Sequence, residues 1–568
     1  MPERKRITLV ADEVLGFVRT GGIGTATTFL SVALARMGHE VELLYVADPP
    51  TAPMAHDWRQ LYDEAGVKIR MLSRSAARIE PPYFGRMRDV EDALASDPPD
   101  VVITQDLAAP AYTALRAHQL GLDFDRTLFV VYCHGGRRWI TDMAQKVRVL
   151  PGAHAVTELE RTSVELADVV VSPSSYLIGW MQDEGWRIPP QTFVIPHLSR
   201  STATGEVQAR VTTNGGPARR IAFFGRLEER KGLKPFAAGV NALPPELLRN
   251  LELEFVGAAT PAWPRERIES LFAEQTKRSL RRISFQTDLD QTEAFARLSR
   301  PGTLAVMPSL GETFSNAVYE CLERGIPFIA SNAGAPPELV APEDRDRVLF
   351  EPSGEGVALA LRRALSNGEA LEPARGAFDA PAALQRWADV VAMQPQARPR
   401  HDASDSVLVC DRDDVLDDAC RETLAGAQAA SGADVVTCGV RLESGVERLF
   451  LGEPRGLGVI ANHYGTVGRV RRSLLPAGAE DEDPWLLYAR LSLDGASIVS
   501  IPRALATRRE PPGDVDNNPA TALRVVEQFE RRLPDPLRAL ARLAAGLAAS
   551  PAAPRPRPSL LRKLLRRP

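Results

Sequence analysis

The sequence predicts an α/β protein in which two doubly wound, Rossmann-like parallel-sheet domains follow one another and a smaller α/β module comes last. Three observations predict this arrangement. The chain opens with a strand, a glycine turn, a helix and a strand; the same alternation restarts near residue 219; and a Pro- and charge-rich stretch at 394–404 ends it.

The first domain is expected over residues 1–198. The apolar run ITLVADEV precedes the turn GGIGT at 21–25, and a helix then leads to Gly38 and to a second strand at 41–46. This order is a βαβ unit of a parallel sheet. The later strands are continuous apolar runs, as expected where helices cover both sheet faces; they occupy 100–105, 127–136, 168–175 and 193–199.

The second domain is expected over 220–393, after a polar, Gly- and Thr-rich linker at 199–219. Its late helix, at 382–393, should pack somewhere on the pair of domains. Because ligands of open parallel sheets bind beyond the carboxyl ends of the strands, the two domains should enclose a cleft. The apolar strand-like runs lie at 219–227, 251–257, 282–289, 303–310, 326–331 and 347–352.

A third, α/β-like module is expected over 405–515, after the linker at 394–404, and a helical and basic tail over 516–568. The tail ends in SLLRKLLRRP, whose leucines alternate with basic residues. Such a segment suits peripheral contact with an anionic membrane surface, although a disordered basic tail is an equally good interpretation.

Composition restricts the class of protein. The 568 residues are 44% hydrophobic and 25% charged, which is typical of soluble globular domains. The formal net charge of −4 gives no reason to expect nucleic acid as a partner. The five cysteines lack metal-ligand spacing, and no apolar run is long enough for a membrane span. The prediction is a cytoplasmic protein, associated with the cytoplasmic face of a membrane if the tail binds there.

Two stretches carry the candidate chemistry. In GRLEERKG, Arg226 and Lys231 follow a strand, where they could neutralise a departing diphosphate; the alternative is a solvated surface loop. In SLGETFSNAVYECLERGIPFIAS, Glu312 precedes a helix start and Glu320 lies inside that helix. Seen alone, these acids would be a helix-cap residue and a surface residue.

With GGIGT, GRLEERKG and GETFSNAVYECLERGIPFIASNAGAPPELV, the chain from about residue 5 to 393 resembles the family 4 glycosyltransferases, which have the GT-B fold. The resemblance implies transfer of a sugar from a nucleotide-sugar donor, with retention at the anomeric carbon and without a metal cofactor. The implied acceptor is a glycan or a lipid-linked glycan, in surface polysaccharide or glycoconjugate biosynthesis.

The resemblance also assigns site residues. It implies catalytic roles for His134, after the strand VYCHGG, and for Glu312; it assigns no protein base. Gly22 and Gly24 have a packing turn as their alternative, and His134 a buried or capping histidine. His197 stands where the family often has asparagine, which leaves that contact uncertain. The implied donor-binding residues are Gly22, Gly24, Arg226, Lys231, Phe314, Ser315, Asn316 and Glu320.

The third module, with VLVCDRDD, resembles the second half of a family 2 glycosyltransferase of GT-A fold. That resemblance implies a Mg or Mn site at Asp411 and Asp413, and a base among the acids at 480–483 before Trp485. The nucleotide-binding half of such a domain has no room before residue 405. A vestigial or structural module is therefore favoured over a second active site.

Two other classes of protein are alternatives to a glycosyltransferase. A non-catalytic nucleotide-sugar or glycan-binding GT-B protein is disfavoured because all five of these residues are present: His134, Arg226, Lys231, Glu312 and Glu320. A nicotinamide-dependent oxidoreductase is disfavoured because Thr27 stands where the third glycine of the G-x-G-x-x-G fingerprint belongs. The sequence does not identify the sugar, the nucleotide or the acceptor.

Overall fold

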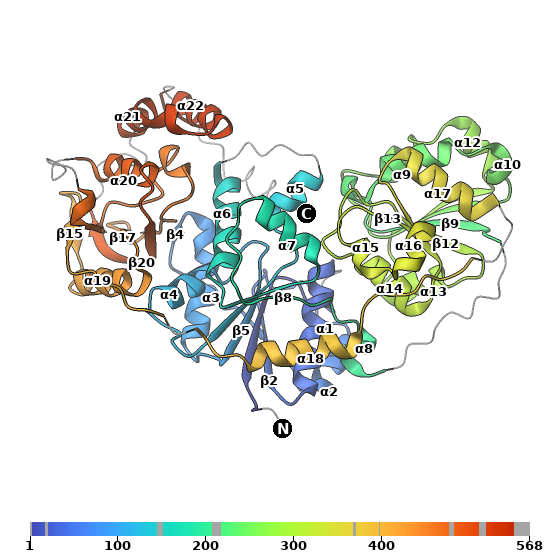
Figure 1. Ribbon diagram of the computed structural model, residues 1–568, viewed down its shortest axis with the longest axis horizontal. Helices are drawn as coiled ribbons and strands as arrows, with labels where there is room; N and C mark the ends of the chain where they lie inside the picture. The colour runs from blue at the N-terminus through green and yellow to red at the C-terminus, as the bar shows by residue number, and fades with distance from the viewer. Residues whose placement is uncertain are drawn as a thin grey trace.

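The computed structural model describes residues 3–17, 21–50, 52–144, 151–206, 217–366, 371–396, 398–475, 482–509 and 519–549. Two domains with parallel sheets and a third module make up this part of the chain. The first domain lies between the second domain and the third module (Figure 1). One side of the first domain therefore faces the second domain, and its other side faces the third module.

The first domain is built on a seven-stranded parallel sheet in the order β3-β2-β1-β5-β6-β7-β8. Its central strands are buried along their whole length, as their continuous apolar sequences predict. The strands are β1 Arg6–Ala11, β2 Glu40–Tyr45, β3 Lys68–Met71, β5 Val101–Gln105, β6 Leu128–Tyr132, β7 Val169–Ser172 and β8 Thr192–Val194.

Helices connect these strands and cover both faces of the sheet (Figure 1). The glycine turn predicted before the first helix is short, because α1 already begins at Gly22. Gly38, with φ of 98°, ends the connection to β2. The helices are α1 Gly22–Arg36, α2 His56–Ala65, α3 Pro82–Ala95, α4 Tyr112–Gln119, α5 Arg137–Met143, α6 Pro151–Leu166, α7 Ser175–Asp183 and α8 Arg200–Thr204.

The second domain has a six-stranded parallel sheet in the order β11-β10-β9-β12-β13-β14. The order reverses at β9, which lies between β10 and β12, and a ligand crevice opens at such a reversal. The strands are β9 Arg220–Phe224, β10 Glu252–Val256, β11 Arg282–Gln286, β12 Thr303–Met307, β13 Phe328–Ser331 and β14 Leu349–Phe350.

The helices of the second domain include the one on which the sequence prediction depends, α14, which starts at Asn316. Ser315 caps it from a left-handed conformation, with φ of 81°. The helical elements are η1 Glu229–Lys231, α9 Leu233–Asn241, α10 Pro245–Leu248, α11 Arg265–Glu269, α12 Glu274–Ser279, α13 Gln291–Leu298, α14 Asn316–Arg324, α15 Pro336–Leu339, α16 Pro342–Val348 and α17 Gly354–Ser366.

The late helix α18, Ala380–Ala392, crosses back to the first domain (Figure 1). Trp387 is fully buried there, and its ring centroid lies 5.1 Å from that of Tyr132. Arg386 donates a hydrogen bond of 2.9 Å to the carbonyl of Val194. The helix at the end of the predicted second domain therefore packs into the core of the first.

The third module has a mixed sheet in which β17 pairs antiparallel with β19 and parallel with β20. Two helices from the predicted tail region, α21 and α22, pack into its hydrophobic core. The elements are β15 Ser406–Val409, β16 Asp414–Leu416, α19 Cys420–Ser431, β17 Val435–Leu442, β18 Glu447–Arg448, η2 Leu457–Val459, β19 Gly468–Arg471, η3 Arg472–Leu474, α20 Pro484–Leu493, β20 Ile498–Arg508, α21 Pro519–Phe529, η5 Glu530–Arg532 and α22 Asp535–Ala549.

The sheet of the third module includes one short strand that belongs to the first domain. Strand β18 pairs in parallel with the short strand β4, Ile79–Glu80, of the first domain. Beside this pair, Leu449 packs in an apolar cluster with Phe84 and Tyr112 of the first domain. Arg503 also reaches across to Glu91, at 3.0 Å. The module is thus attached by backbone, apolar and ionic contacts.

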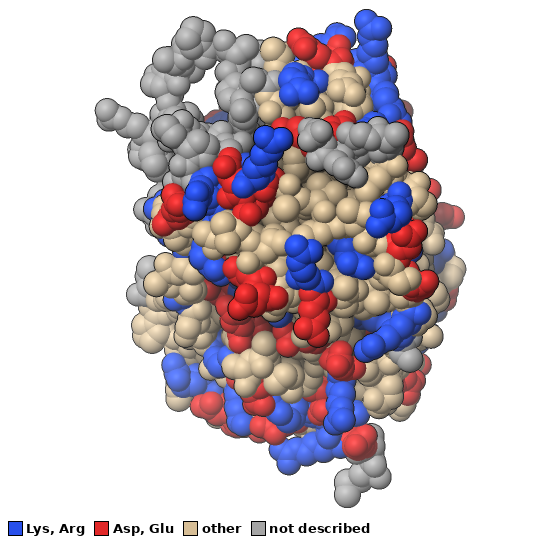
Figure 2. Space-filling view, turned by 90° about the vertical axis from the view of Figure 1, so that its left-hand side faces the viewer, with Lys and Arg blue, Asp and Glu red and all other residues tan. Residues whose placement is uncertain are grey.

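The outer face on the side of the third module carries basic and acidic side chains interspersed around an uncharged area (Figure 2). Among the described residues, no helix combines the length and the hydrophobicity that a membrane span requires. The predicted basic segment SLLRKLLRRP lies outside the described residues.

Candidate functional site between the two parallel-sheet domains

The loop after β9 and the loop before α14 bring opposite charges into contact. The Nζ atom of Lys231 lies 2.5 Å from a carboxylate oxygen of Glu312. The guanidinium of Arg230 lies 3.3 Å from the other oxygen of that carboxylate. The sequence predicted Lys231 and Glu312 for this site. Arg230 belongs to the same loop but was not predicted for this site, so the structure adds it.

The protonation state of Glu312 follows from these contacts. Burial opposes ionisation of this carboxyl, but the charges of Lys231 and Arg230 outweigh burial and lower its pKa to about 2. Burial lowers the pKa of Lys231, against the opposing charge of Glu312. Glu312 is therefore an ionised partner of two cations at neutral pH.

Arg226 lies at the start of the same loop, two residues after the end of β9. Its side chain is 41% exposed and lies 3.8 Å from Glu228. Its guanidinium is close to the glycine turn of the first domain, because a Cβ atom built on Gly21 would lie 3.0 Å from it. The strand end of the second domain and the helix start of the first thus meet at this arginine.

The glycines and Asn316 meet across the same boundary. The amide of Asn316 donates a hydrogen bond of 3.4 Å to the carbonyl of Gly22, and its oxygen lies 2.9 Å from Nδ1 of His197. Gly24 is different, because it is buried inside the first turn of α1. Of the two predicted glycines, only Gly22 is shown at the boundary between the domains.

Phe314 and Ser315 shape the start of α14. Phe314 is 2% exposed and packs against His197, with ring centroids 4.4 Å apart. The hydroxyl of Ser315 accepts a hydrogen bond from the amide of Val318. The side chains of both residues are thus used for packing and capping, so a role in donor binding would rest on their backbone amides.

His134 lies on the first-domain side, at the carboxyl end of β6. Its ring centroid is 5.2 Å from that of His197. Its carbonyl accepts a hydrogen bond of 2.9 Å from the hydroxyl of Thr313 in the second domain. Burial and the neighbouring His197 lower the pKa of His134 well below its ordinary value. Both imidazoles are neutral at pH 7, since burial also lowers the pKa of His197 to about 4.

The His134 turn is held by a buried carboxylate that the sequence analysis did not single out. Asp106 accepts hydrogen bonds from the backbone amides of His134, at 2.8 Å, and Gly135, at 3.0 Å. Glu160 does the same for Ala108 and Arg137, both at 2.8 Å. In the sequence, Asp106 is only a polar residue at a strand end, a feature that is common in α/β proteins.

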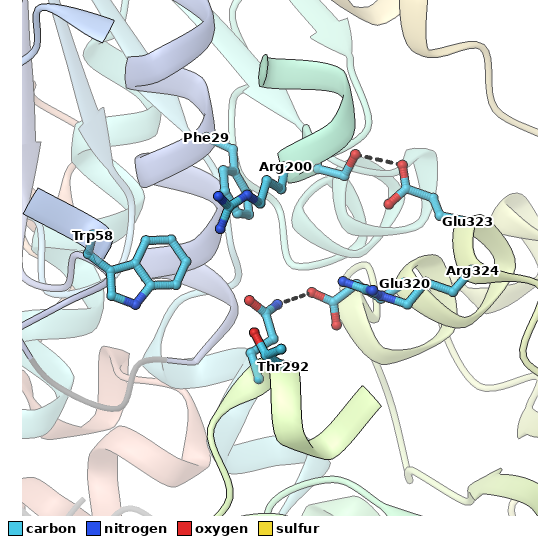
Figure 3. A pocket seen from close by; sticks show the side chains of 9 residues that line it. Phe29, Trp58, Arg200, Thr292, Glu320, Glu323 and Arg324 are labelled. Atoms are coloured by element: carbon cyan, nitrogen blue, oxygen red, sulfur yellow. Dashed lines mark hydrogen bonds between the residues drawn. The ribbon is translucent and has the colours of Figure 1, made fainter. Parts of the chain in front are cut away.

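Glu320 lies in a pocket between the two domains, on the flank of α14 (Figure 3). Gln291 donates a hydrogen bond of 2.6 Å to its carboxyl group. Burial raises the pKa of Glu320 to about 8, against the lowering effect of Arg324. Phe29 and Trp58 of the first domain form the opposite wall. Glu312 and Glu320 thus face different parts of the domain boundary.

The acids of the third module are already paired. Arg508 lies 3.1 Å from Asp411 and 3.2 Å from Asp414, whose side chain is fully buried. Asp413 is exposed, and its amide donates to Asp411. Among the described residues, no group of three or more acidic, histidine or cysteine side chains is arranged to hold a metal ion. An arginine therefore supplies the positive charge beside Asp411.

The predicted acids before Trp485 have structural roles where they are described. Asp483 caps α20 by accepting a hydrogen bond of 2.9 Å from the amide of Trp485. Glu482 pairs with Arg490. Glu480 and Asp481 lie outside the described residues.

Comparison with known protein families matches the two parallel-sheet domains separately. Residues 20–197 match the model described as Glycosyltransferase Family 4, and residues 218–367 match the model described as Glycosyl transferases group 1. The chain is a glycosyltransferase. The predicted enzyme class is confirmed, and the structure shows the two tandem parallel-sheet domains that the predicted GT-B arrangement requires. The resemblance of the third module to a GT-A half stays a prediction.

Relatives of this glycosyltransferase include glycogen synthase of Mycobacterium tuberculosis, in strains CDC 1551 and H37Rv. It is 26% identical over an alignment of 420 residues, and the match covers 67% of this chain and 88% of the relative. Similar solved structures include sucrose-phosphate synthase from Thermosynechococcus elongatus (19% identity, TM-score 0.48, 68% of this chain and 96% of that chain) and Anabaena Alr3699/HepE in complex with UDP and glucose (16%, 0.45, 68% and 100%).

Proposed function

We propose that this glycosyltransferase moves a hexosyl group from a nucleotide-sugar donor to a glycan or lipid-linked acceptor, in surface polysaccharide or glycoconjugate biosynthesis. The observation that carries the proposal is the ion pair of Lys231 with Glu312, which Arg230 joins, with Arg226 at the start of the same loop. A relative named glycogen synthase supports a hexosyl donor and a glycan acceptor.

The cations of this site fit a departing nucleoside diphosphate. Charge that develops on the leaving phosphate needs positive groups fixed beside it, and Arg226 and Lys231 come from one loop after a strand end. On donor binding, the diphosphate takes the place of Glu312 as the partner of Lys231. Transfer then needs no metal, because the protein supplies the charge.

The carboxylate released in this exchange has a second use. Glu312 is ionised, so it can accept hydrogen bonds from hydroxyl groups of the donor sugar. The neutral His134 lies across the boundary and can bond the same sugar from the first domain. We assign no protein base; the leaving phosphate oxygen takes the proton of the acceptor hydroxyl, and the product retains the anomeric configuration.

The proposal is tested by incubating the full-length protein with a panel of nucleotide sugars and measuring released nucleotide. One donor should be hydrolysed slowly by the wild type and not by Glu312→Gln. The variant should still be stabilised thermally by the matching nucleoside diphosphate. Stabilisation without hydrolysis of any donor would instead support a non-catalytic binding protein. Stabilisation by NAD and by no sugar nucleotide would contradict both functions.

A further inference from the structure

A second hollow lies in the first domain, on the side that faces the third module. It is lined by the segment after β3 and by the first turns of α3. Asp48 and Arg74 each follow a strand end by three residues, so the hollow lies beyond the carboxyl edge of the sheet, where parallel sheets bind ligands. Neither family model nor sequence motif assigned a ligand to it.

Three arginines, Arg74, Arg78 and Arg86, line this hollow. Arg86 pairs with Asp12 at 3.4 Å, and Arg74 pairs with Asp48 at 3.0 Å. Asp48 is 82% exposed, so water screens that pair. Arg78 makes no ion pair with any residue that the structure describes. Arg78 is thus free, and Arg74 is easily released, to bind an incoming anion.

The acidic side chains of the same hollow are already occupied. Asp89 is buried and accepts a hydrogen bond of 3.1 Å from the amide of Ser75. Glu80 pairs with Arg448 of the third module at 3.4 Å. Since Arg74 and Arg86 also have carboxylate partners, Arg78 is the arginine of the hollow with unused hydrogen-bonding capacity, and a guanidinium binds phosphate or carboxylate with paired hydrogen bonds.

The third module fixes one wall of the hollow. The amide of Glu447 donates to the carbonyl of Arg78 at 2.8 Å, and the amide of Leu449 donates to the carbonyl of Glu80 at 2.9 Å. Strand β18 therefore holds the backbone on both sides of Ile79. This attachment gives the third module a role that needs no catalysis of its own.

Arg86 of the hollow is also linked, through contacts between residues, to the proposed donor site. Arg86 pairs with Asp12, and the neighbouring Glu13 accepts a hydrogen bond of 3.1 Å from the amide of Gly21. Gly21 in turn lies against Arg226. Contacts of Arg86 thus connect the hollow to the site of the departing diphosphate.

We propose that this hollow is the acceptor site, that Arg78 with Arg74 and Arg86 binds a phosphate or carboxylate group of the acceptor, and that the third module holds Arg78 in place. The proposal rests on the proposed glycosyl transfer and adds the chemical class of acceptor: a sugar that carries an anionic group.

Binding to the full-length protein is measured by calorimetry with glucose 6-phosphate, glucuronate and glucose. At least one anionic sugar should bind about tenfold more tightly than glucose, and the tighter of the two identifies phosphate or carboxylate as the group recognised. Arg78→Ala should weaken that binding about tenfold, because a charge-assisted pair is lost. The exposed Arg126, on the opposite edge of the same sheet, provides the matched control, and Arg126→Ala should bind like the wild type.

A second pair of variants tests whether the third module contributes to anion binding in the hollow. Arg448→Ala removes the partner of Glu80, whose free carboxylate should then repel the anion and weaken binding several-fold; Arg472→Ala, on the exposed side of the same module, should not. Equal binding of glucose and the anionic sugars, or unchanged binding by Arg78→Ala, would overturn the proposal. Thermal stabilisation by UDP, ADP or GDP on the same samples tests the donor site separately. Its absence would count against glycosyl transfer while leaving the anion result intact.

Discussion

The ammonium group of Lys231 lies 2.5 Å from the carboxylate of Glu312. A nucleotide-sugar donor must compete with this carboxylate for the lysine. The pair therefore keeps the lysine oriented and partly desolvated before the donor arrives, and its opening is part of donor binding. Such preorganised charge is the main way in which proteins stabilise a leaving group without a metal.

Lys231→Ala should reduce kcat/KM for donor hydrolysis by about 100- to 1,000-fold, which corresponds to about 2.7–4 kcal/mol for one lost donor to the developing charge. Lys234→Ala is the matched control. Lys234 lies three residues further on, pairs with Glu229 and is more than half exposed. A Lys231→Ala enzyme with near-normal hydrolysis would remove the lysine from the reaction.

Glu320→Gln should change how stability depends on pH. The pKa of Glu320 is raised by burial to about 8, above the ordinary value of 4.5. The folded protein therefore keeps a proton that the unfolded chain releases, and wild-type stability falls as pH rises from about 4.5 to 8. The glutamine variant does not titrate. Its Tm should therefore fall less than that of the wild type between pH 5 and pH 8, and parallel curves would contradict the raised pKa.

Glu320→Ala tests ligand binding by the same residue. Its pocket lies between the domains, where ribose hydroxyls could replace Gln291 as its partners. Because such bonds exist in the ground state and the transition state alike, the donor KM should rise about fivefold to tenfold, while kcat changes little. A fall in kcat alone would argue against the ribose role.

The buried carboxyls that hold the His134 turn predict an acid limb in the pH–rate profile. Burial raises the pKa of Asp106 to about 6 and that of Glu160 to about 7, although backbone amides oppose both shifts. At lower pH, protonation of Asp106 and Glu160 removes carboxylate oxygens that accept hydrogen bonds from the backbone around His134. Turnover should therefore fall below pH 7. Asp106→Asn should lower turnover about tenfold at pH 7.5 and abolish the lower inflection. A profile of unchanged shape in this variant would assign that limb elsewhere.

Trp387→Ala should destabilise the first domain rather than the second, although Trp387 lies at the end of the second domain in sequence. Its side chain is fully buried against Tyr132, and truncation of such a residue costs about 3–5 kcal/mol. Hydrogen exchange should show loss of protection in β6 with little change in β12. Gln385→Ala, at an exposed position of the same helix, is the control.

Chelation tests whether the reaction needs a metal. EDTA should leave donor hydrolysis within about twofold of its starting rate, since Arg226, Arg230 and Lys231 supply the charge that a cation would otherwise provide. Loss of hydrolysis that Mn restores would contradict this expectation. It would also reopen the question of a metal site in the third module.

Much of the fold could be predicted from the sequence because the strands of a parallel sheet are continuous apolar runs, and turns and helices follow them in a regular order. The pairing of Lys231 with Glu312 follows from two loops at neighbouring strand ends, β9 and β12. These features are local or depend on one sheet, so periodicity and motif spacing report them well.

The parts that the sequence did not predict depend on contacts between distant segments. Arg230 looks like one more solvated charge until Glu312 lies beside it. His197 looked like a departure from the family pattern, yet it fills the space between His134 and Phe314. Asp411 matched a metal ligand, but Arg508, almost a hundred residues later, now neutralises it. No spacing rule connects such partners.

The course of α18 limits how the two large domains can move. The chain leaves the first domain after α8, and it comes back through α18, which packs beside α8 (Figure 1). Both chain connections between the two domains therefore lie at the same place on the first domain, beside α8. Opening should be a swing about that place, so that admission of the donor and escape of the spent nucleotide share one path.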